Sequence, residues 1–215
     1  MKKYFLLLII VLFCATAKMK GQTAPQLTAT IDSLRSAIAM QQGKEMMDTY
    51  QRLAWDLYDT DDLQKYFDFM EEYEAALLHE IRRERDEELI NVYIRRYALK
   101  KLNYAYFAYN WKEYEIAEKQ TRIGLEFCLE HEEKENKLYY YMLFDVLLEI
   151  LDVTLQHETL QHEILKLYED ARANNDIAGM SVAAFSLARF YKNQERWAEA
   201  EKYYRESIEL FNQQS

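Results

Sequence analysis

The stretch at residues 184–207, AFSLARFYKNQERWAEAEKYYRES, has the pattern of two helices joined by a polar turn. On both sides of the turn at 193–195, apolar or small side chains recur three or four positions apart, which is the spacing of one face of an α-helix. Ala188 and Ala200 put a small side chain on each apolar face. Small residues let two helix backbones approach closely while large neighbours fill the space around them. The stretch therefore predicts an antiparallel helical hairpin.

The composition extends this helical interpretation to the rest of the chain. The 215 residues include four glycines and one proline, whereas strand-rich folds use these residues in turns and phosphate-binding loops need glycine. A doubly wound nucleotide-binding fold and a β-sandwich are therefore excluded, and the fold class is all-α. One amphipathic helix is expected within 23–41, where apolar residues repeat at helical spacing. Eight further helices are expected at 44–58, 62–79, 87–109, 112–131, 135–152, 156–173, 176–193 and 196–212.

These eight helices group into successive pairs of similar length. A recurring two-helix unit is typical of an α-solenoid, in which each unit buries its apolar face by stacking on its neighbours. An irregular helical bundle with the same periodicity is the alternative. We expect an N-terminal capping helix within 22–43 and a repeat domain over 44–215. The four expected pairs cover 44–79, 87–131, 135–173 and 176–212.

The last pair resembles the tetratricopeptide repeat (TPR). The first helix of that repeat carries large-x-x-Leu-small-x-x-Tyr, and its second carries aromatic-x-x-Ala-x-x-x-aromatic-x-x-small. The matching residues are Ala184, Leu187, Ala188, Tyr191, Trp197, Ala200, Tyr204 and Ser207. The second pair keeps part of this pattern in Tyr114, Ala117 and Gly124, with Thr121 in place of an aromatic residue, and the other two pairs keep less of it. The resemblance implies a TPR-like superhelix, although the units here exceed the family's usual length of about 34 residues.

A TPR-like stack implies that the first helix of each pair lines a concave binding face. On the third pair this face runs from Tyr141 through Asp145 to Leu148. Aromatic side chains are favoured at protein interfaces, so the resemblance implies a protein or peptide partner. A tight superhelix that buries these rings in its core is the alternative. The candidate partner-binding residues are Trp55, Tyr58, Asn103, Tyr106, Tyr109, Tyr141, Asp145, Arg189 and Lys192.

The sequence offers no catalytic residues, metal site or cofactor site. His157 and His162 lie five positions apart, about 140° around a helix, so they cannot share a metal ion. Cys128 has His131 nearby, but acidic neighbours are expected to raise the pKa of the thiol and make it a poor nucleophile. We expect a protein without enzymatic activity. The net charge of −10 and the lack of a basic run predict no nucleic-acid partner.

The N-terminus has the pattern of a signal peptide. A basic start at 1–3 precedes an apolar run at 4–13 and the small residues at 15–17. We expect a signal peptide over 1–21, cleaved after residue 17 or 21, with no membrane span in the mature chain. A buried core helix is the alternative for this segment.

Export implies a periplasmic or secreted protein. Cys14 suggests an acylated lipoprotein, but the bulky Phe13 directly before it argues against one. At the C-terminus we expect one face of the last helix to pack on its own pair, through Trp197, Ala200, Tyr204, Ser207, Ile208 and Phe211. Tyr203 and Leu210 are then expected to turn outward and to support weak self-association through this last helix.

Two functional hypotheses follow from these observations. The first is an exported TPR-like scaffold that binds a protein or peptide in an aromatic concave groove. The alternative is the sensory or ligand-binding region of a signalling system, acting with or fused to a membrane or effector component. Groove side chains define a chemistry and not the identity of a partner.

Overall fold

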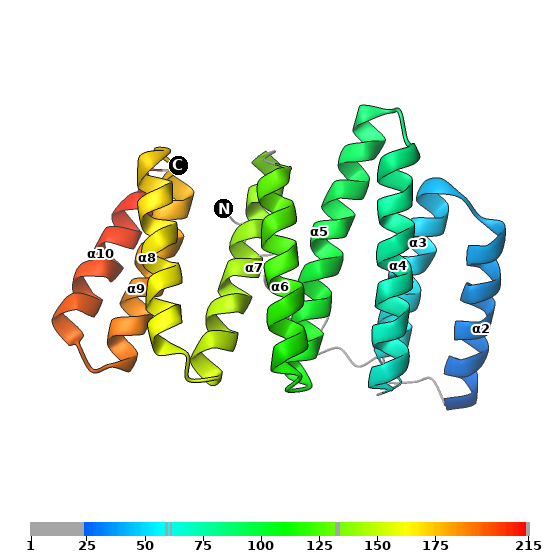
Figure 1. Cartoon of the computed structure of the whole chain (residues 1–215), viewed down its shortest axis with the longest axis horizontal. Helices are drawn as coiled ribbons and strands as arrows, with labels where there is room; N and C mark the ends of the chain where they lie inside the picture. Colours follow the sequence, from blue (N-terminus) through cyan, green and yellow to red (C-terminus); the bar gives the residue numbers. More distant parts are fainter. Residues whose placement is uncertain (1–23, 59, 61, 132–133, 214–215) are drawn as a thin grey trace. The chain divides into compact units, whose positions relative to one another are not determined.

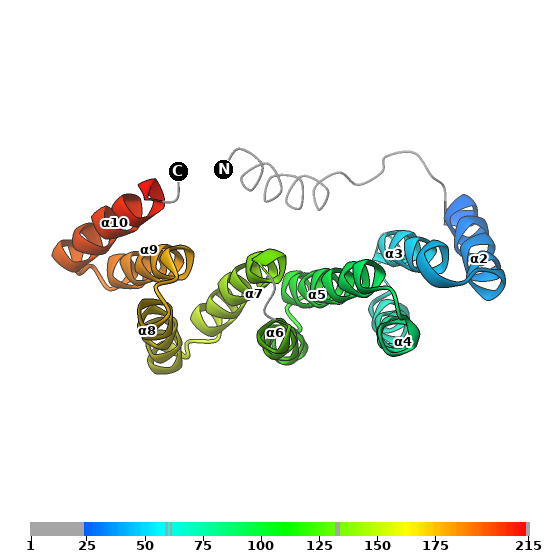
Figure 2. The same ribbon diagram turned by 90° about the horizontal axis from the view of Figure 1, so that it is seen from above.

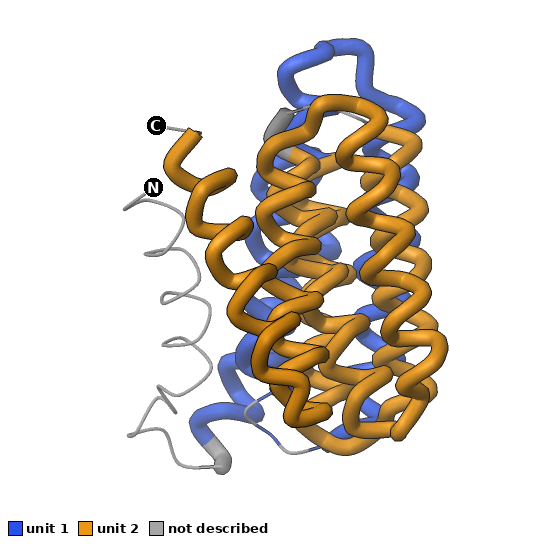
Figure 3. The backbone as a smooth tube through the Cα atoms, turned by 90° about the vertical axis from the view of Figure 1, so that its left-hand side faces the viewer, with its two compact units in different colours: residues 1–93 blue, residues 94–215 orange. Residues whose placement is uncertain are grey.

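The chain is helical throughout the part that its computed structural model describes, residues 24–58, 60, 62–131 and 134–213 (Figure 1). The expected all-α fold class is therefore confirmed for these residues. The expected signal peptide at 1–21 lies outside them. The chain divides into two compact units, residues 1–93 and 94–215, which Figure 3 shows in different colours. The division falls within helix α5, and each unit is described by itself.

Unit 1 consists of α2 (Ala24–Met40), α3 (Gly43–Tyr58), α4 (Leu63–Arg83) and the first residues of α5 (Glu87–Asn110). Helix α3 packs against both α2 and α4. Its Tyr50 ring stacks on Phe69 and Tyr73 of α4, with ring centroids 5.5 and 5.2 Å away. Aromatic side chains thus form much of the core of this unit.

Helix α4 continues to Arg83, past its expected end at residue 79. Glu80 is buried, and its carboxylate pairs with Arg83 at 3.2 Å, so this turn remains helical. The connection to α5 is correspondingly short. Asp86 begins α5 by accepting hydrogen bonds from the backbone N–H groups of Glu88 and Leu89.

Unit 2 contains the rest of α5 and five further helices, in which consecutive helices from α6 to α10 pack on one another. Figure 2 shows α6 and α8 below α7 and α9. A shared core joins α7 to α10 and includes Leu147, Leu151 and Leu187, which are almost fully buried. The helices are α6 (Tyr114–Glu130), α7 (Lys134–Val153), α8 (His157–Ala173), α9 (Ile177–Asn193) and α10 (Trp197–Asn212).

Small residues lie where the helices of unit 2 come closest. A methyl group on Gly179 of α9 would lie 2.8 Å from the Ala171 Cβ of α8. Between α9 and α10, the Ser181 hydroxyl donates to the Ser207 carbonyl at 3.1 Å, and the Ser207 hydroxyl donates to the Ser181 carbonyl at 3.0 Å. Ala188 and Ala200, which the sequence placed at a close helix crossing, are both buried.

Four turns in unit 2 share one backbone geometry. Each joins two helices through three residues, and the middle residue is left-handed, with φ between 52° and 64°. The following N–H donates to the carbonyl five positions earlier at 2.8–2.9 Å, which satisfies a carbonyl that the helix end leaves without a partner. Because none of the middle residues is glycine, the scarcity of glycine is compatible with tight turns. The four middle residues are Lys112, Leu155, Asn175 and Glu195.

The expected orientation of α10 is right for Ala200 and Ser207, which are buried, but wrong at the edges of the face. Trp197, Ile208 and Phe211 are 63%, 60% and 46% exposed, so they do not face their own pair. Tyr203, expected to turn outward, instead stacks on Tyr191 with ring centroids 5.6 Å apart. The serine contact between α9 and α10 centres the packed face on Ala200 and Ser207, so Tyr203 lies within this face and Ile208 lies outside it.

Within the described residues, no helix is both long and apolar enough to cross a membrane.

Candidate functional site

An arginine held by two carboxylates marks one face of unit 2. Arg189 of α9 places its Nη1 3.2 Å from Asp145 Oδ1, and its Nη2 donates to Glu149 Oε1. Asp145 and Glu149 lie one turn apart on α7, so both carboxylates reach the same guanidinium. This network ties α7 to α9 across the face and fixes the direction of the Arg189 side chain.

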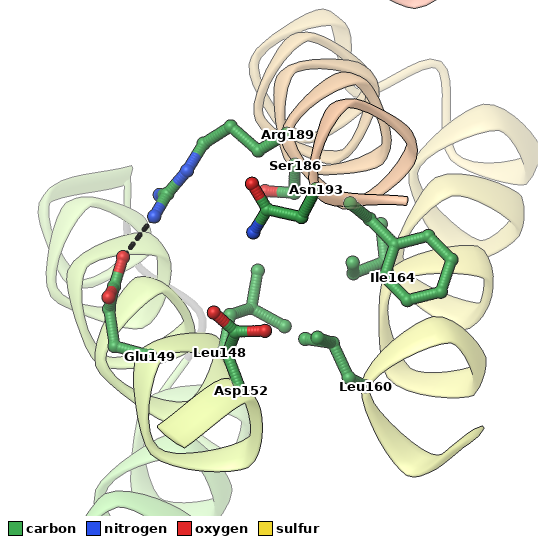
Figure 4. A pocket seen from close by; sticks show the side chains of 9 residues that line it. Leu148, Glu149, Asp152, Leu160, Ile164, Ser186, Arg189 and Asn193 are labelled. Carbon is green, nitrogen blue, oxygen red and sulfur yellow. Dashed lines mark hydrogen bonds and ion pairs between the residues drawn. The ribbon is translucent and has the colours of Figure 1, made fainter. Parts of the chain in front are cut away.

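A pocket opens beside this network, between α7, α8 and α9 (Figure 4). Its floor is apolar, because Leu148, Leu160 and Ile164 are buried there. Figure 4 shows Asp152 of α7 and Asn193 of α9 near its opening. The pocket therefore combines an apolar floor with polar groups at its edge, the usual composition of a binding site. It is lined by Leu148, Glu149, Asp152, Leu160, Ile164, Ser186, Arg189, Phe190 and Asn193.

Tyr109 of α5 belongs to the same face. Burial raises the pKa of Tyr109, and the nearby carboxylates of Glu149 and Asp152 raise it further. Its ring packs against Tyr114, with centroids 5.8 Å apart. The structure thus brings together Tyr109, Asp145 and Arg189, three of the candidate residues, from three different helices.

Three further candidates in unit 2 are not members of the Arg189 network. Lys192 is exposed near the end of α9. Asn103 and Tyr106 are half-buried on α5, where the Tyr106 ring contacts the neighbouring Phe107 edge-on. These three residues remain candidates by their position alone.

Tyr141 has a structural role that the sequence did not suggest. Its hydroxyl donates to Asp176 Oδ2 at 2.6 Å, and Lys137 contacts the same oxygen at 3.2 Å. The other oxygen of Asp176 accepts the N–H of Gly179 at 3.1 Å and so caps α9. Burial raises the pKa of Tyr141 well above its usual value, and the bond to Asp176 adds to this shift. Tyr141 therefore helps to hold the start of α9.

Trp55 and Tyr58 belong to α3 in unit 1. Both are half-buried, and the Tyr58 ring contacts Tyr66 edge-on at a centroid distance of 6.2 Å. They form no part of the face described in unit 2.

Sequence reasoning missed Glu149, Asp152 and Asn193. It followed α7 from Asp145 to Leu148, which forms part of the pocket floor, but it left out Glu149 and Asp152, which line the same pocket. The signal was present in the acidic residues that recur three or four positions apart along this helix. Which of these side chains face the pocket depends on how α7 is rotated about its axis, and the packing of α7 determines that rotation.

Among the residues that the structure describes, no group of three or more His, Cys, Asp or Glu side chains could hold a metal ion. Burial raises the pKa of the Cys128 thiol to about 12, so burial, and not the acidic neighbours invoked from the sequence, disfavours the thiolate.

Comparisons with family models, curated proteins and solved structures give no match.

Proposed function

We propose that this protein is an exported, TPR-like scaffold that binds a protein or peptide segment without catalysing a reaction. The observation that carries this proposal is the Arg189 network beside the pocket of α7, α8 and α9. An apolar floor can bury a partner's side chain, while fixed polar groups at the rim determine its orientation. Tyr109 adds an aromatic side chain of the kind that dominates many protein interfaces.

The TPR-like architecture is supported by a recurring local geometry. The matching turns and the small residues at helix crossings are what a stack of helix pairs requires. They occur together in α9 and α10, the pair whose sequence most resembles the family. Under this proposal, the stacked pairs of unit 2 form the scaffold that presents Tyr109, Asp145 and Arg189 on one face.

Export rests on the basic, apolar and small-residue pattern of 1–21. Mass spectrometry of the protein recovered from cells tests it, and we expect a mature N-terminus before residue 23. An intact Met1 would refute export. A lipid mass on Cys14 would instead mean that the protein is a lipoprotein.

Binding is tested with a random peptide library displayed on phage and selected on the immobilised full chain. We expect selected peptides to bind the wild type in calorimetry. Tyr109→Ala should weaken binding by about fivefold or more by removing an aromatic contact, and Arg189→Ala should do so by untying α7 from α9 beside the pocket. Arg205→Ala is the matched control, because Arg205 is an exposed arginine on α10 that pairs only with Glu201 among the described residues.

The proposal fails if no peptide is selected. It also fails if selected peptides bind both site variants normally while substitutions on the exposed side of α10 abolish binding. Circular dichroism of each variant separates a lost contact from a lost fold.

A further inference from the structure

The pocket beside Arg189 has a charge pattern that indicates which side chain of a partner it accepts. Three carboxylates, from Asp145, Glu149 and Asp152, lie on this part of α7, and Arg189 is the one guanidinium that lines the pocket. Asp145 and Glu149 both contact Arg189. The cation at the rim is thus already neutralised by protein groups, so it is not available to attract an anionic ligand.

Asp152 is the carboxylate that this network leaves uncompensated. The closest basic atom to it among the described residues is Nδ1 of His157, 3.9 Å from Oδ1, which is beyond hydrogen-bonding distance. The Asp152 side chain is 45% exposed, and Figure 4 shows its carboxylate beside Leu148, on the opposite side of the pocket from Asn193. An incoming anion would meet this charge, whose one ion-pair contact among the described residues is the long one to the His157 imidazole, and would be repelled, whereas a cation would be attracted.

The floor adds a requirement for apolar contact close to the charge. Leu148, Leu160 and Ile164 present buried aliphatic carbons between α7 and α8. Lysine and arginine are the side chains that combine an aliphatic stem with a cationic end, and they pack the stem on apolar surface while the charge stays near water. Asn193 lies on the opposite side of the pocket with its amide nitrogen directed toward Asp152 (Figure 4), and a half-turn of that amide presents its oxygen there as a further acceptor.

We infer that this pocket binds the side chain of a lysine or arginine in the partner segment, with the stem over Leu148 and Leu160 and the cationic end at Asp152. This inference rests on the proposed function, because it assigns the chemistry of one anchor within the proposed peptide site. The pocket then selects for basic segments and against acidic ones.

The test uses the peptides selected from the random library on the full chain. We expect lysine or arginine to be enriched at one peptide position. Replacing that residue by norleucine, which keeps the stem of lysine and removes the charge, should weaken binding to the wild type about tenfold in calorimetry. Replacing it by glutamate should weaken binding further, because the glutamate would face Asp152.

Variants of the protein locate the charge that is recognised. Asp152→Asn preserves the shape of the side chain, and it should bind the lysine peptide about as weakly as the wild type binds the norleucine peptide. The two changes together should add little to either alone. Glu209→Gln, an exposed change on α10, is the matched control and should leave binding unaltered.

Two results would overturn the inference while leaving peptide binding intact. One is a set of selected peptides without any basic preference, and the other is equal affinity for the lysine and norleucine peptides. Failure to select any peptide would overturn the proposed function itself. The comparison of peptides on the wild type needs no protein variant, so a misfolded variant cannot produce either result.

Discussion

The contact between α8 and α9 at Gly179 makes a quantitative test of the packing. Gly179→Ala would place a methyl carbon 2.8 Å from both the Ala171 Cβ and the Tyr141 hydroxyl oxygen. Two carbons in contact need about 3.5–4.0 Å, so the two helices must separate by about 1 Å. Overpacking of this kind destabilises a protein by about 1–3 kcal/mol, whereas the better helix propensity of alanine returns up to about 1 kcal/mol. We expect a net loss of about 1–2 kcal/mol in the free energy of unfolding.

Urea unfolding followed by circular dichroism measures this loss as a lower transition midpoint. The double variant Ala171→Gly/Gly179→Ala removes the methyl group that the new one meets. It should be more stable than the sum of the two single changes predicts, with a coupling of about 1 kcal/mol. A Gly179→Ala protein as stable as the parent, or strictly additive effects in the double variant, would refute the close contact.

Two further predictions concern the ends of helices in unit 2. Burial alone would raise the pKa of Asp176, but hydrogen bonds from Tyr141, the Gly179 N–H and Lys137 outweigh this effect and lower the pKa. The ionised carboxylate therefore stabilises the fold above about pH 4, and this contribution is lost as the pH falls through the lowered pKa. Asp176→Asn should therefore cost about 1 kcal/mol at pH 7, with a difference in melting temperature from the wild type that shrinks as the pH falls below about 4; a difference independent of pH would contradict this. Leu155→Gly should stabilise the protein by about 0.5–1 kcal/mol in urea unfolding, because glycine relieves the left-handed conformation at φ 59°. Replacement of the exposed helical residue Lys166 by glycine should destabilise the protein by about 1 kcal/mol. A loss of stability from glycine at both positions would contradict the strain argument.

The sequence predicts where helices lie better than how they rotate. Apolar spacing located the helices of the described residues because burial of one face governs helix formation. The end of α4 was misjudged because Arg82 and Arg83 look like a solvated connection, whereas the buried Glu80 keeps the helix intact to Arg83. The spacing of apolar residues does not reveal that the Glu80 carboxylate is buried and paired with Arg83 one turn later.

The candidate site shows the same limit at the level of single residues. The TPR resemblance implied a common face for Tyr109, Asp145 and Arg189, with spacing choosing the side of each helix, and the structure places all three on one face of unit 2. Glu149 and Asp152 were missed because the rotation of α7 depends on tertiary packing, which one helix alone does not reveal. The rotation of α10 similarly depends on the reciprocal hydrogen bonds between Ser181 and Ser207, which no periodicity predicts.

The shared turn geometry of unit 2 has a consequence for how such a chain can change its length. The turns at Lys112, Leu155, Asn175 and Glu195 have the same three-residue form. The helix that precedes one of these turns can therefore be joined to the helix that follows another through a turn of unchanged geometry. Loss of one helix would reverse the direction of every helix after it, but duplication or deletion of two restores it. Gene rearrangement at these joints therefore conserves the fold in steps of a helix pair, and a binding face can grow or shrink by the same step.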